Sequence, residues 1–175
     1  MHARPLNLAT AFADLAAAAP DRTALRLANG ETVTYGALDA LANRTAHVLS
    51  AHGLERGAVL GILHDKSPVA YAGMLAGLKL GAPYVNLDAS SPPARLGRIL
   101  GRCQPRVLWT DGPHAALLEQ LALPVALGGA LQGGGGLLAH VGLGSPRRAA
   151  LQDPVQHVLE LVEAQGFFQE GVGAV

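Results

Sequence analysis

Apolar and polar positions along the chain predict helices and buried strands in alternation, most clearly over residues 68–100. Apolar side chains recur at helical spacing in the first part of this stretch, at Tyr71, Met74, Leu75 and Leu78. Gly81 follows, where a helix needs a left-handed residue to end. Residues 83–87 then have the composition of a buried strand. A second helix is predicted next, with Ser91 as its cap and Pro92 in its first turn.

The same patterning extends to both sides of this stretch. Before this stretch, the pattern predicts a helix over 8–19, a hairpin over 24–34 that turns at Asn29-Gly30, and a helix from Tyr35 that Thr34 caps and Gly53 ends. A buried strand over 59–63 leads to the helix that Ser67 caps and Pro68 begins. After the stretch, the predicted elements are a strand over 106–110, a helix over 114–121 and a short strand over 124–127. Strands that alternate with helices between residues 35 and 127 predict an α/β fold with a parallel sheet. Its apolar strands need helices on both faces to be buried.

The pattern changes after Leu127. A run of four glycines at residues 133–136 predicts a flexible linker, and residues 137–148 show no clear period. Asp153 and Pro154 then predict the start of a helix with an apolar stripe over residues 154–165. The sequence therefore predicts a domain over residues 1–127, followed by a Gly-rich linker and tail helix over residues 128–175.

Composition excludes several classes of function. Half of the residues are apolar, and 13 cationic side chains balance 13 anionic ones, so no basic nucleic-acid surface is indicated. The single cysteine, Cys103, excludes an intramolecular disulfide framework and fits a reducing compartment. The first residues lack a signal-peptide pattern, and no apolar run is long enough to cross a bilayer. We therefore expect a cytoplasmic protein without a membrane or nucleic-acid partner.

Candidate chemical groups are scattered. The seven histidines form no HExxH pattern, and there is no CxxC pair, Walker loop or GxSxG elbow. His64 and His114, near predicted strand ends, are interpreted as solvated or incidentally packed. Asp88 ends a predicted strand, where α/β proteins often bind ligands, but it is interpreted as a turn residue. No base is evident for the Cys103 thiol. No catalytic, cofactor-binding or metal-binding residue is predicted.

Two stretches resemble adenylate-forming enzymes. LKLGAPYVNLDASSPPARLGRIL, residues 78–100, is similar to the family segment LKAGxAYVPLDPxxPxxRLxxIL, with Asn86 in place of a proline. VTYGALDALANRTAHVLSAHGL, residues 33–54, is similar to LTYxELxxxAxxLAxxLxxxGV, with Ala37 in place of a glutamate. The resemblance is strongest to the adenylation domains of nonribosomal peptide synthetases, with acyl-CoA synthetases as cousins. It covers residues 12–127 and implies the N-terminal subdomain of such an enzyme, with a flavodoxin-like sheet covered by helices.

The resembled family joins an acid to the α-phosphate of ATP and uses Mg²⁺. It places a TSGTTGxPKG loop after the matched segment and a lysine, later in the chain, against the acyl phosphate. The 175 residues of this sequence contain no such loop. Residues 142–148 are nearest in composition and are interpreted as a plain turn. The two lysines, Lys66 and Lys79, lie in the matched structural part, and Lys79 is expected to hold its head in water. We therefore expect no adenylation and no cofactor for this chain alone.

Two other interpretations stay open. The chain could be a non-catalytic interaction or scaffolding module, with the helix over residues 154–165 covering a sheet edge, or a truncated gene product without function. In the resembled enzymes this subdomain packs against a second subdomain, so the absence of the second subdomain would expose apolar surface on the first. The expected partner interaction is self-association or docking to another synthetase part through that surface.

Overall fold

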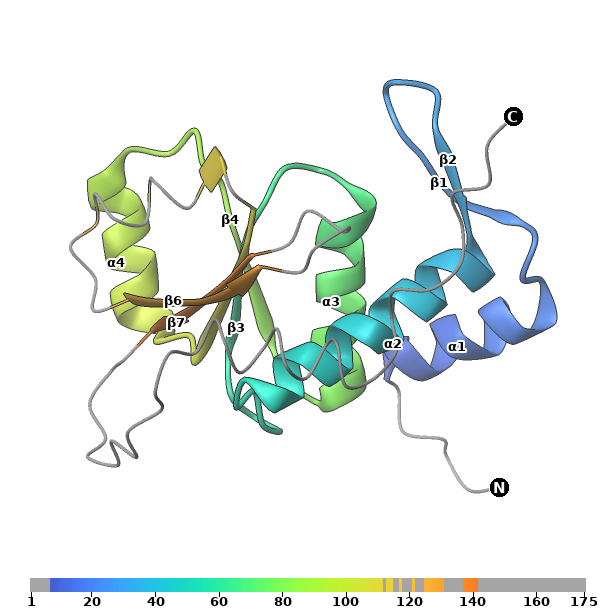
Figure 1. The fold of residues 1–175 in the computed structure, drawn as a ribbon, viewed down its shortest axis with the longest axis horizontal. Helices are drawn as coiled ribbons and strands as arrows, with labels where there is room; N and C mark the ends of the chain where they lie inside the picture. Colours follow the sequence, from blue (N-terminus) through green and yellow to red (C-terminus); the bar gives the residue numbers. More distant parts are fainter. Residues whose placement is uncertain are drawn as a thin grey trace. The chain divides into compact units, whose positions relative to one another are not determined.

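A computed structural model describes residues 7–111, 113–114, 117, 121, 125–130 and 137–141 (Figure 1). The elements in chain order are α1 (Leu8–Ala18), β1 (Thr23–Arg26), β2 (Thr32–Thr34), α2 (Tyr35–Ala51), β3 (Leu60–Leu63), α3 (Pro68–Leu80), β4 (Tyr84–Leu87), α4 (Pro93–Cys103), β5 (Val107–Thr110), β6 (Val125–Ala130) and β7 (Leu137–Val141). Three predicted features lie outside the described residues: the linker at 133–136, the turn at 142–148 and the tail helix at 154–165.

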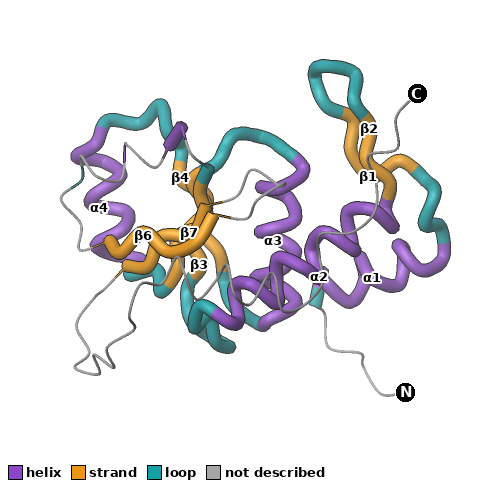
Figure 2. The backbone as a smooth tube through the Cα atoms, viewed as in Figure 1, coloured by secondary structure: helices purple, strands orange, loops and turns teal. Residues whose placement is uncertain are grey.

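One sheet holds five strands in the order β4-β3-β5-β7-β6 (Figure 2). Strand β3 is parallel to both of its neighbours, and Leu60 lies opposite Tyr84 of β4 and Val107 of β5. The chain therefore passes from β3 to β4 on one side and then crosses to β5 on the other side of β3. This order confirms the predicted parallel arrangement of the strands at residues 59–63, 83–87 and 106–110.

The part of the sheet beyond β5 differs from the prediction. The sequence predicts a short strand over residues 124–127 that continues the parallel sheet, followed by a Gly-rich linker and by residues 137–148 without a clear period. Instead β6 extends to Ala130 and pairs antiparallel with β7, which is itself antiparallel to β5. Only residues 131–136 join β6 to β7, and a parallel crossover needs a dozen residues or more. The short apolar run of β7 has no alternation of apolar and polar residues, so periodicity alone does not reveal it.

Most predicted helix ends are confirmed by their hydrogen bonds. The Thr34 Oγ1 accepts a hydrogen bond from the Ala37 N–H at 3.2 Å, which caps α2. The Ser67 Oγ does the same for the Ala70 N–H at 3.2 Å, and Pro68 begins α3. Gly81 ends α3 with a left-handed φ of 70°. Among the described residues, no helix is long and apolar enough to cross a membrane.

Helix α4 begins one residue later than predicted. Pro92 is the residue that precedes the helix, Pro93 begins it, and no side chain caps it. The Ser91 N–H instead donates to the Asp88 carbonyl at 2.9 Å, so Ser91 belongs to the preceding turn. Two successive prolines, which lack N–H groups, leave fewer donors at this end for a serine to satisfy.

The β1–β2 hairpin turns through a longer loop than the predicted Asn29-Gly30 pair. Strand β1 ends at Arg26 and β2 begins at Thr32. The Leu27 N–H donates to the Glu31 carbonyl at 2.8 Å, and the Gly30 N–H donates to the Leu27 carbonyl at 3.0 Å. The Asn29 Oδ1 accepts from the Glu31 N–H, so this side chain supports the loop.

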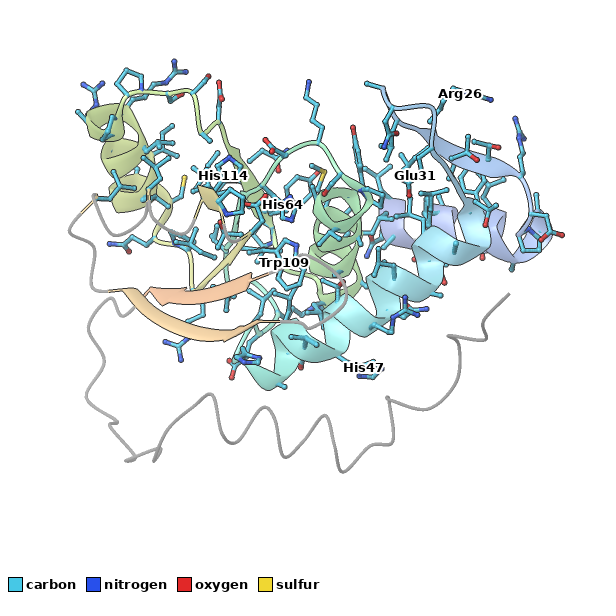
Figure 3. The ribbon with its side chains drawn as sticks, turned by 45° about the horizontal axis from the view of Figure 1, so that its top comes forward. Arg26, Glu31, His47, His64, Trp109 and His114 are labelled. Carbon is cyan, nitrogen blue, oxygen red and sulfur yellow. The ribbon has the colours of Figure 1, made fainter. Side chains whose placement is uncertain are left out.

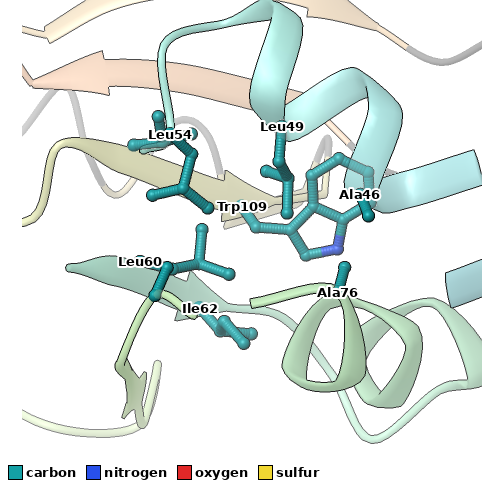
Figure 4. Close-up of a cluster of buried hydrophobic side chains, with 9 residues drawn as sticks. Ala46, Leu49, Leu54, Leu60, Ile62, Ala76 and Trp109 are labelled. Carbon is teal, nitrogen blue, oxygen red and sulfur yellow. The ribbon is translucent and has the colours of Figure 1, made fainter. Parts of the chain in front are cut away.

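Helices cover both faces of the parallel strands, as predicted (Figure 1). On one face, α2 and α3 pack on the side chains of β3 and β5, with Ala46, Leu49, Ala76, Leu60, Ile62, Val107 and Trp109 buried together (Figure 4). On the other face, α4 packs its residues Leu96 and Leu100 against Leu63, Leu87 and Leu108. Successive residues of a strand point to opposite faces, so β3 and β5 each contribute to both clusters, whereas Val85 and Leu87 of β4 belong to the second.

Helix α3 meets the sheet with its small residues. Its buried positions are all alanine or glycine: Ala70, Ala72, Gly73, Ala76 and Gly77. The four large residues that predict an apolar face are only half-buried, and they line a hollow beside α1 and the hairpin. Small side chains let the backbone of α3 approach β3 and β5 closely. Met74 also packs against the cluster on that face, whereas Tyr71 and Leu75 pack against a second cluster shared with α2.

Candidate functional site

A polar cluster lies at the carboxyl ends of β3 and β5. His64 directly follows β3, and Asp111 directly follows β5. Because Leu63 pairs with Thr110 in register, these two polar residues come side by side, and the His64 Nδ1 lies 3.3 Å from the Asp111 Oδ2. With Asp65, Ser67 and His114 they form what we call the carboxyl-edge cluster. Figure 3 shows the imidazoles of His64 and His114 close together above the buried Trp109.

The imidazole of His114 lies between two carboxylates. Its Nδ1 pairs with the Asp111 Oδ1, which also accepts the His114 backbone N–H at 3.1 Å. Its Nε2 faces the Asp65 Oδ1 at 3.8 Å. The side chains of Asp111 and His114 are 11% and 15% exposed, whereas that of Asp65 is 83% exposed. The cluster is therefore closed at Asp111 and open to solvent at Asp65.

Asp111 carries a negative charge at neutral pH. Burial raises the pKa of its carboxyl, but hydrogen bonds from the His114 side chain and backbone, together with the nearby His64, outweigh this and hold the pKa below its ordinary value. The Asp111 carboxylate thus lies between two imidazoles: His114 donates hydrogen bonds to its Oδ1, and His64 faces its Oδ2.

The cluster is not arranged as a serine nucleophile with its base. In such a triad the hydroxyl and the carboxylate bind opposite nitrogens of one imidazole. Here the Ser67 Oγ and the Asp111 Oδ2 both face the same nitrogen of His64, Nδ1, at 3.2 and 3.3 Å. The Ser67 hydroxyl also accepts the N–H that caps α3. The geometry therefore favours a binding role over covalent catalysis.

Strand order places this cluster where open α/β sheets bind their ligands. Strand β4 follows β3 in the chain and lies on one side of it, whereas β5 lies on the other side. The carboxyl ends of β3 and β5 thus flank the point at which the strand order reverses, and crevices at such points receive ligands.

The cluster was not evident from sequence reasoning. The sequence interprets His64 and His114 as solvated or incidentally packed, whereas in the structure both side chains lie beside one shared carboxylate. Asp111 precedes Gly112 and Pro113, and from sequence this triplet is interpreted as a turn. The available signal was a polar residue directly after each of two apolar strands, since parallel strands bring such residues together at one edge.

Other residues that the sequence singles out lie apart from the cluster. The ammonium group of Lys79 is not fully solvated, contrary to the prediction. Its Nζ lies 2.8 Å from the Asp39 Oδ1 of α2, and the Lys79 side chain is only 18% exposed. The Asp88 Oδ1 accepts hydrogen bonds from the N–H and hydroxyl of Ser90, at 2.9 and 2.7 Å, which agrees with the predicted turn. Cys103 ends α4 and is half-buried.

A hollow of about 460 Å³ lies between α1, the hairpin and α3. Its walls are mostly apolar, with Leu8, Phe12, Leu15, Tyr35, Met74 and Tyr84 among them. Leu8, Leu15 and Tyr84 are also the large apolar residues that are most exposed in the described part of the chain, Leu8 at 71%. This surface, which we call the apolar hollow, is the second candidate site.

The sequence profile of the AMP-binding enzyme family matches residues 12–137. The chain belongs to the AMP-binding enzyme family. This membership confirms the predicted resemblance, and the matched residues of this AMP-binding chain include β1 to β6 and end at the first residue of β7.

Relatives of this AMP-binding chain include peptide synthetases and CoA ligases. Surfactin synthase subunit 2 of Bacillus subtilis is 37% identical over 114 residues, which cover 65% of the chain. The 3-hydroxybenzoate–CoA ligase of an Aromatoleum species is 35% identical over 91 residues, or 52% of the chain. The chain spans only 3% and 17% of the lengths of these two proteins.

The fold is shared with solved N-terminal parts of such enzymes. The N-terminal domain of FACL13 from Mycobacterium tuberculosis superposes with a TM-score of 0.61 and 25% identity. The superposition covers 65% of this chain and 29% of that domain. This likeness confirms the predicted class, an α/β fold like the N-terminal subdomains of adenylate-forming enzymes.

Proposed function

We propose that these residues serve as part of the N-terminal subdomain of an acid–AMP ligase, of the peptide-synthetase or acyl-CoA-synthetase type. The observation that carries the proposal is the family match over residues 12–137. We further propose that the 175 residues do not adenylate an acid by themselves.

The second part of the proposal rests on what ATP requires. A bound polyphosphate needs backbone N–H donors on a loop rich in glycine and hydroxyl residues, with cationic side chains beside it. The described residues do not fit this group: Lys79 is paired with Asp39, and Lys66 is an exposed loop residue. The carboxyl-edge cluster, with Asp65 and Asp111, would repel a triphosphate.

Equilibrium binding of labelled ATP in the presence of Mg²⁺ tests this directly. The expected result is no saturable binding up to millimolar ATP, with the Aromatoleum CoA ligase as the positive control. A saturable, Mg²⁺-dependent site of micromolar affinity in the 175 residues would contradict the proposal.

The apolar hollow favours a second role, as a surface through which copies of the chain self-associate. Leu8 and Leu15 lie on α1 with 71% and 37% of their surface exposed, and such apolar residues gathered on one face are typical of protein contacts. The double variant Leu8→Ser with Leu15→Ser should reduce self-association in sedimentation velocity. His47→Ser, on the exposed face of α2, is the matched control.

If the parent protein sediments as a monomer and binds no more apolar dye than the double variant, this surface has no docking role.

A further inference from the structure

Three side chains of the carboxyl-edge cluster offer ligand atoms that converge. Asp65, Asp111 and His114 each supply one oxygen or nitrogen atom, and these atoms all lie within 4.8 Å of one another. Ligand atoms about 2.0–2.2 Å from a tetrahedral zinc ion lie roughly 3.3–3.6 Å apart. Small movements therefore suffice to close the set around an ion. Asp65, with 83% of its side chain exposed on the loop before α3, can make the largest of them.

The donor set selects a class of ion. One imidazole nitrogen with two carboxylate oxygens suits Zn²⁺ and its transition-metal neighbours, whereas Mg²⁺ and Ca²⁺ favour sets made of oxygen alone. We propose that Asp65, Asp111 and His114 bind one divalent transition-metal ion of the Zn²⁺ type.

Contacts from the His114 backbone and from His64 hold Asp111 in place. The Asp111 Oδ1 accepts the His114 backbone N–H at 3.1 Å, and the Asp111 Oδ2 faces the His64 Nδ1 at 3.3 Å. Contacts of this kind orient a ligand before a metal arrives, and they raise the affinity of the site for the metal.

The site also has an open side. The nitrogen of His114 that faces Asp65 points toward the exposed end of the cluster, 3.8 Å from the Asp65 Oδ1. Three protein ligands leave a fourth tetrahedral position for water or for a small anionic or carbonyl ligand. Together with the position of the cluster at the reversal of strand order, this makes the metal site accessible rather than sealed.

The proposal is tested by titrating the tag-free 175-residue protein with Zn²⁺ in an isothermal titration calorimeter. Co²⁺ serves as a spectroscopic substitute, because tetrahedral Co²⁺ absorbs strongly in the visible and quenches nearby tryptophan. Trp109 is the only tryptophan of the chain, and it lies two residues before Asp111. We expect one saturable site, with the visible band and the quenching rising at the same metal concentration.

Variants separate this site from adventitious binding elsewhere. Asp65→Asn and His114→Ala should each weaken Zn²⁺ binding more than tenfold, whereas His47→Ala, an exposed histidine on α2, should leave it unchanged (Figure 3). Asp65 is exposed, so its variant keeps the fold, which far-ultraviolet circular dichroism verifies. The proposal is overturned if the parent binds no Zn²⁺ saturably, or if Asp65→Asn binds it as the parent does. Neither result depends on whether the chain binds ATP.

Discussion

The indole ring of Trp109 lies so close to Gly73 that a Cβ atom on Gly73 would come within 2.8 Å of the ring. The same ring donates its N–H to the Val69 carbonyl at 3.2 Å. Trp109 is fully buried on β5, and both contacts are to helix α3. This pair therefore fixes how closely α3 approaches the sheet whose carboxyl edge carries the polar cluster.

Gly73→Ala should destabilise the protein. The added methyl group meets a rigid aromatic ring, and overpacking of this kind costs about 1–3 kcal/mol. Alanine gains about 1 kcal/mol over glycine within a helix, which offsets part of this cost. Urea unfolding monitored by Trp109 fluorescence should show a free energy of unfolding up to about 2 kcal/mol below that of the parent.

Gly97→Ala on α4 is the matched control. A Cβ atom there meets nothing within 4 Å, so only the helix-propensity gain of up to about 1 kcal/mol is expected. Equal stabilities of the two variants would show that the Trp109 ring shifts to accommodate the methyl group and does not limit how closely α3 packs on the sheet.

The Lys79–Asp39 pair should couple α3 to α2. Its Nζ–Oδ1 distance is 2.8 Å, and both side chains are less than a quarter exposed, so solvent screens the pair only in part. A double-mutant cycle with Lys79→Met and Asp39→Asn should give a coupling free energy of about 1 kcal/mol, smaller in 1 M salt. A cycle that pairs Lys79→Met with the distant Ser90→Ala is the control and should give none. Strictly additive Lys79 and Asp39 effects would contradict the ion pair.

Ser90→Ala should raise the pKa of Asp88 toward its ordinary value. The Ser90 hydroxyl is the largest cause that lowers this pKa, followed by the Ser90 backbone N–H, while desolvation raises it slightly. Because the folded-state pKa is depressed, the stability that Asp88 contributes is present above its unfolded-state pKa and is lost as the pH falls through the folded-state value. A carbon-13 titration of the Asp88 carboxyl measures the shift, and an unchanged pKa in the variant would contradict the turn geometry.

Local signals predict most of this fold because they depend on neighbours in sequence. The caps at Thr34 and Ser67 and the left-handed Gly81 follow from backbone chemistry within one turn, and all are confirmed. The contact face of α3 was not predictable in this way, because large apolar residues dominate a periodicity although Gly73 and Ala76 make the close approach. The antiparallel β7 was missed because an apolar run of five residues is ambiguous without its partner strand.

The carboxyl-edge cluster is harder to predict, because strand register brings its members together across the chain. His64 and Asp111 are 47 positions apart, and only the pairing of Leu63 with Thr110 makes them neighbours. Their spacing matches no metal or catalytic motif, so a search by motif finds nothing. A reader of the sequence who assumed parallel strands could have placed both at one edge, but not in contact.

Acid-dependent exchange of labelled pyrophosphate into ATP tests the central claim most directly. The claim is that the 175 residues form the N-terminal α/β part of an acid–AMP ligase without its adenylation chemistry. The purified chain should show no exchange above background with any amino, aryl or fatty acid, while the Aromatoleum CoA ligase assayed beside it exchanges with its own acid. Robust exchange by the chain alone with any one acid would contradict the account.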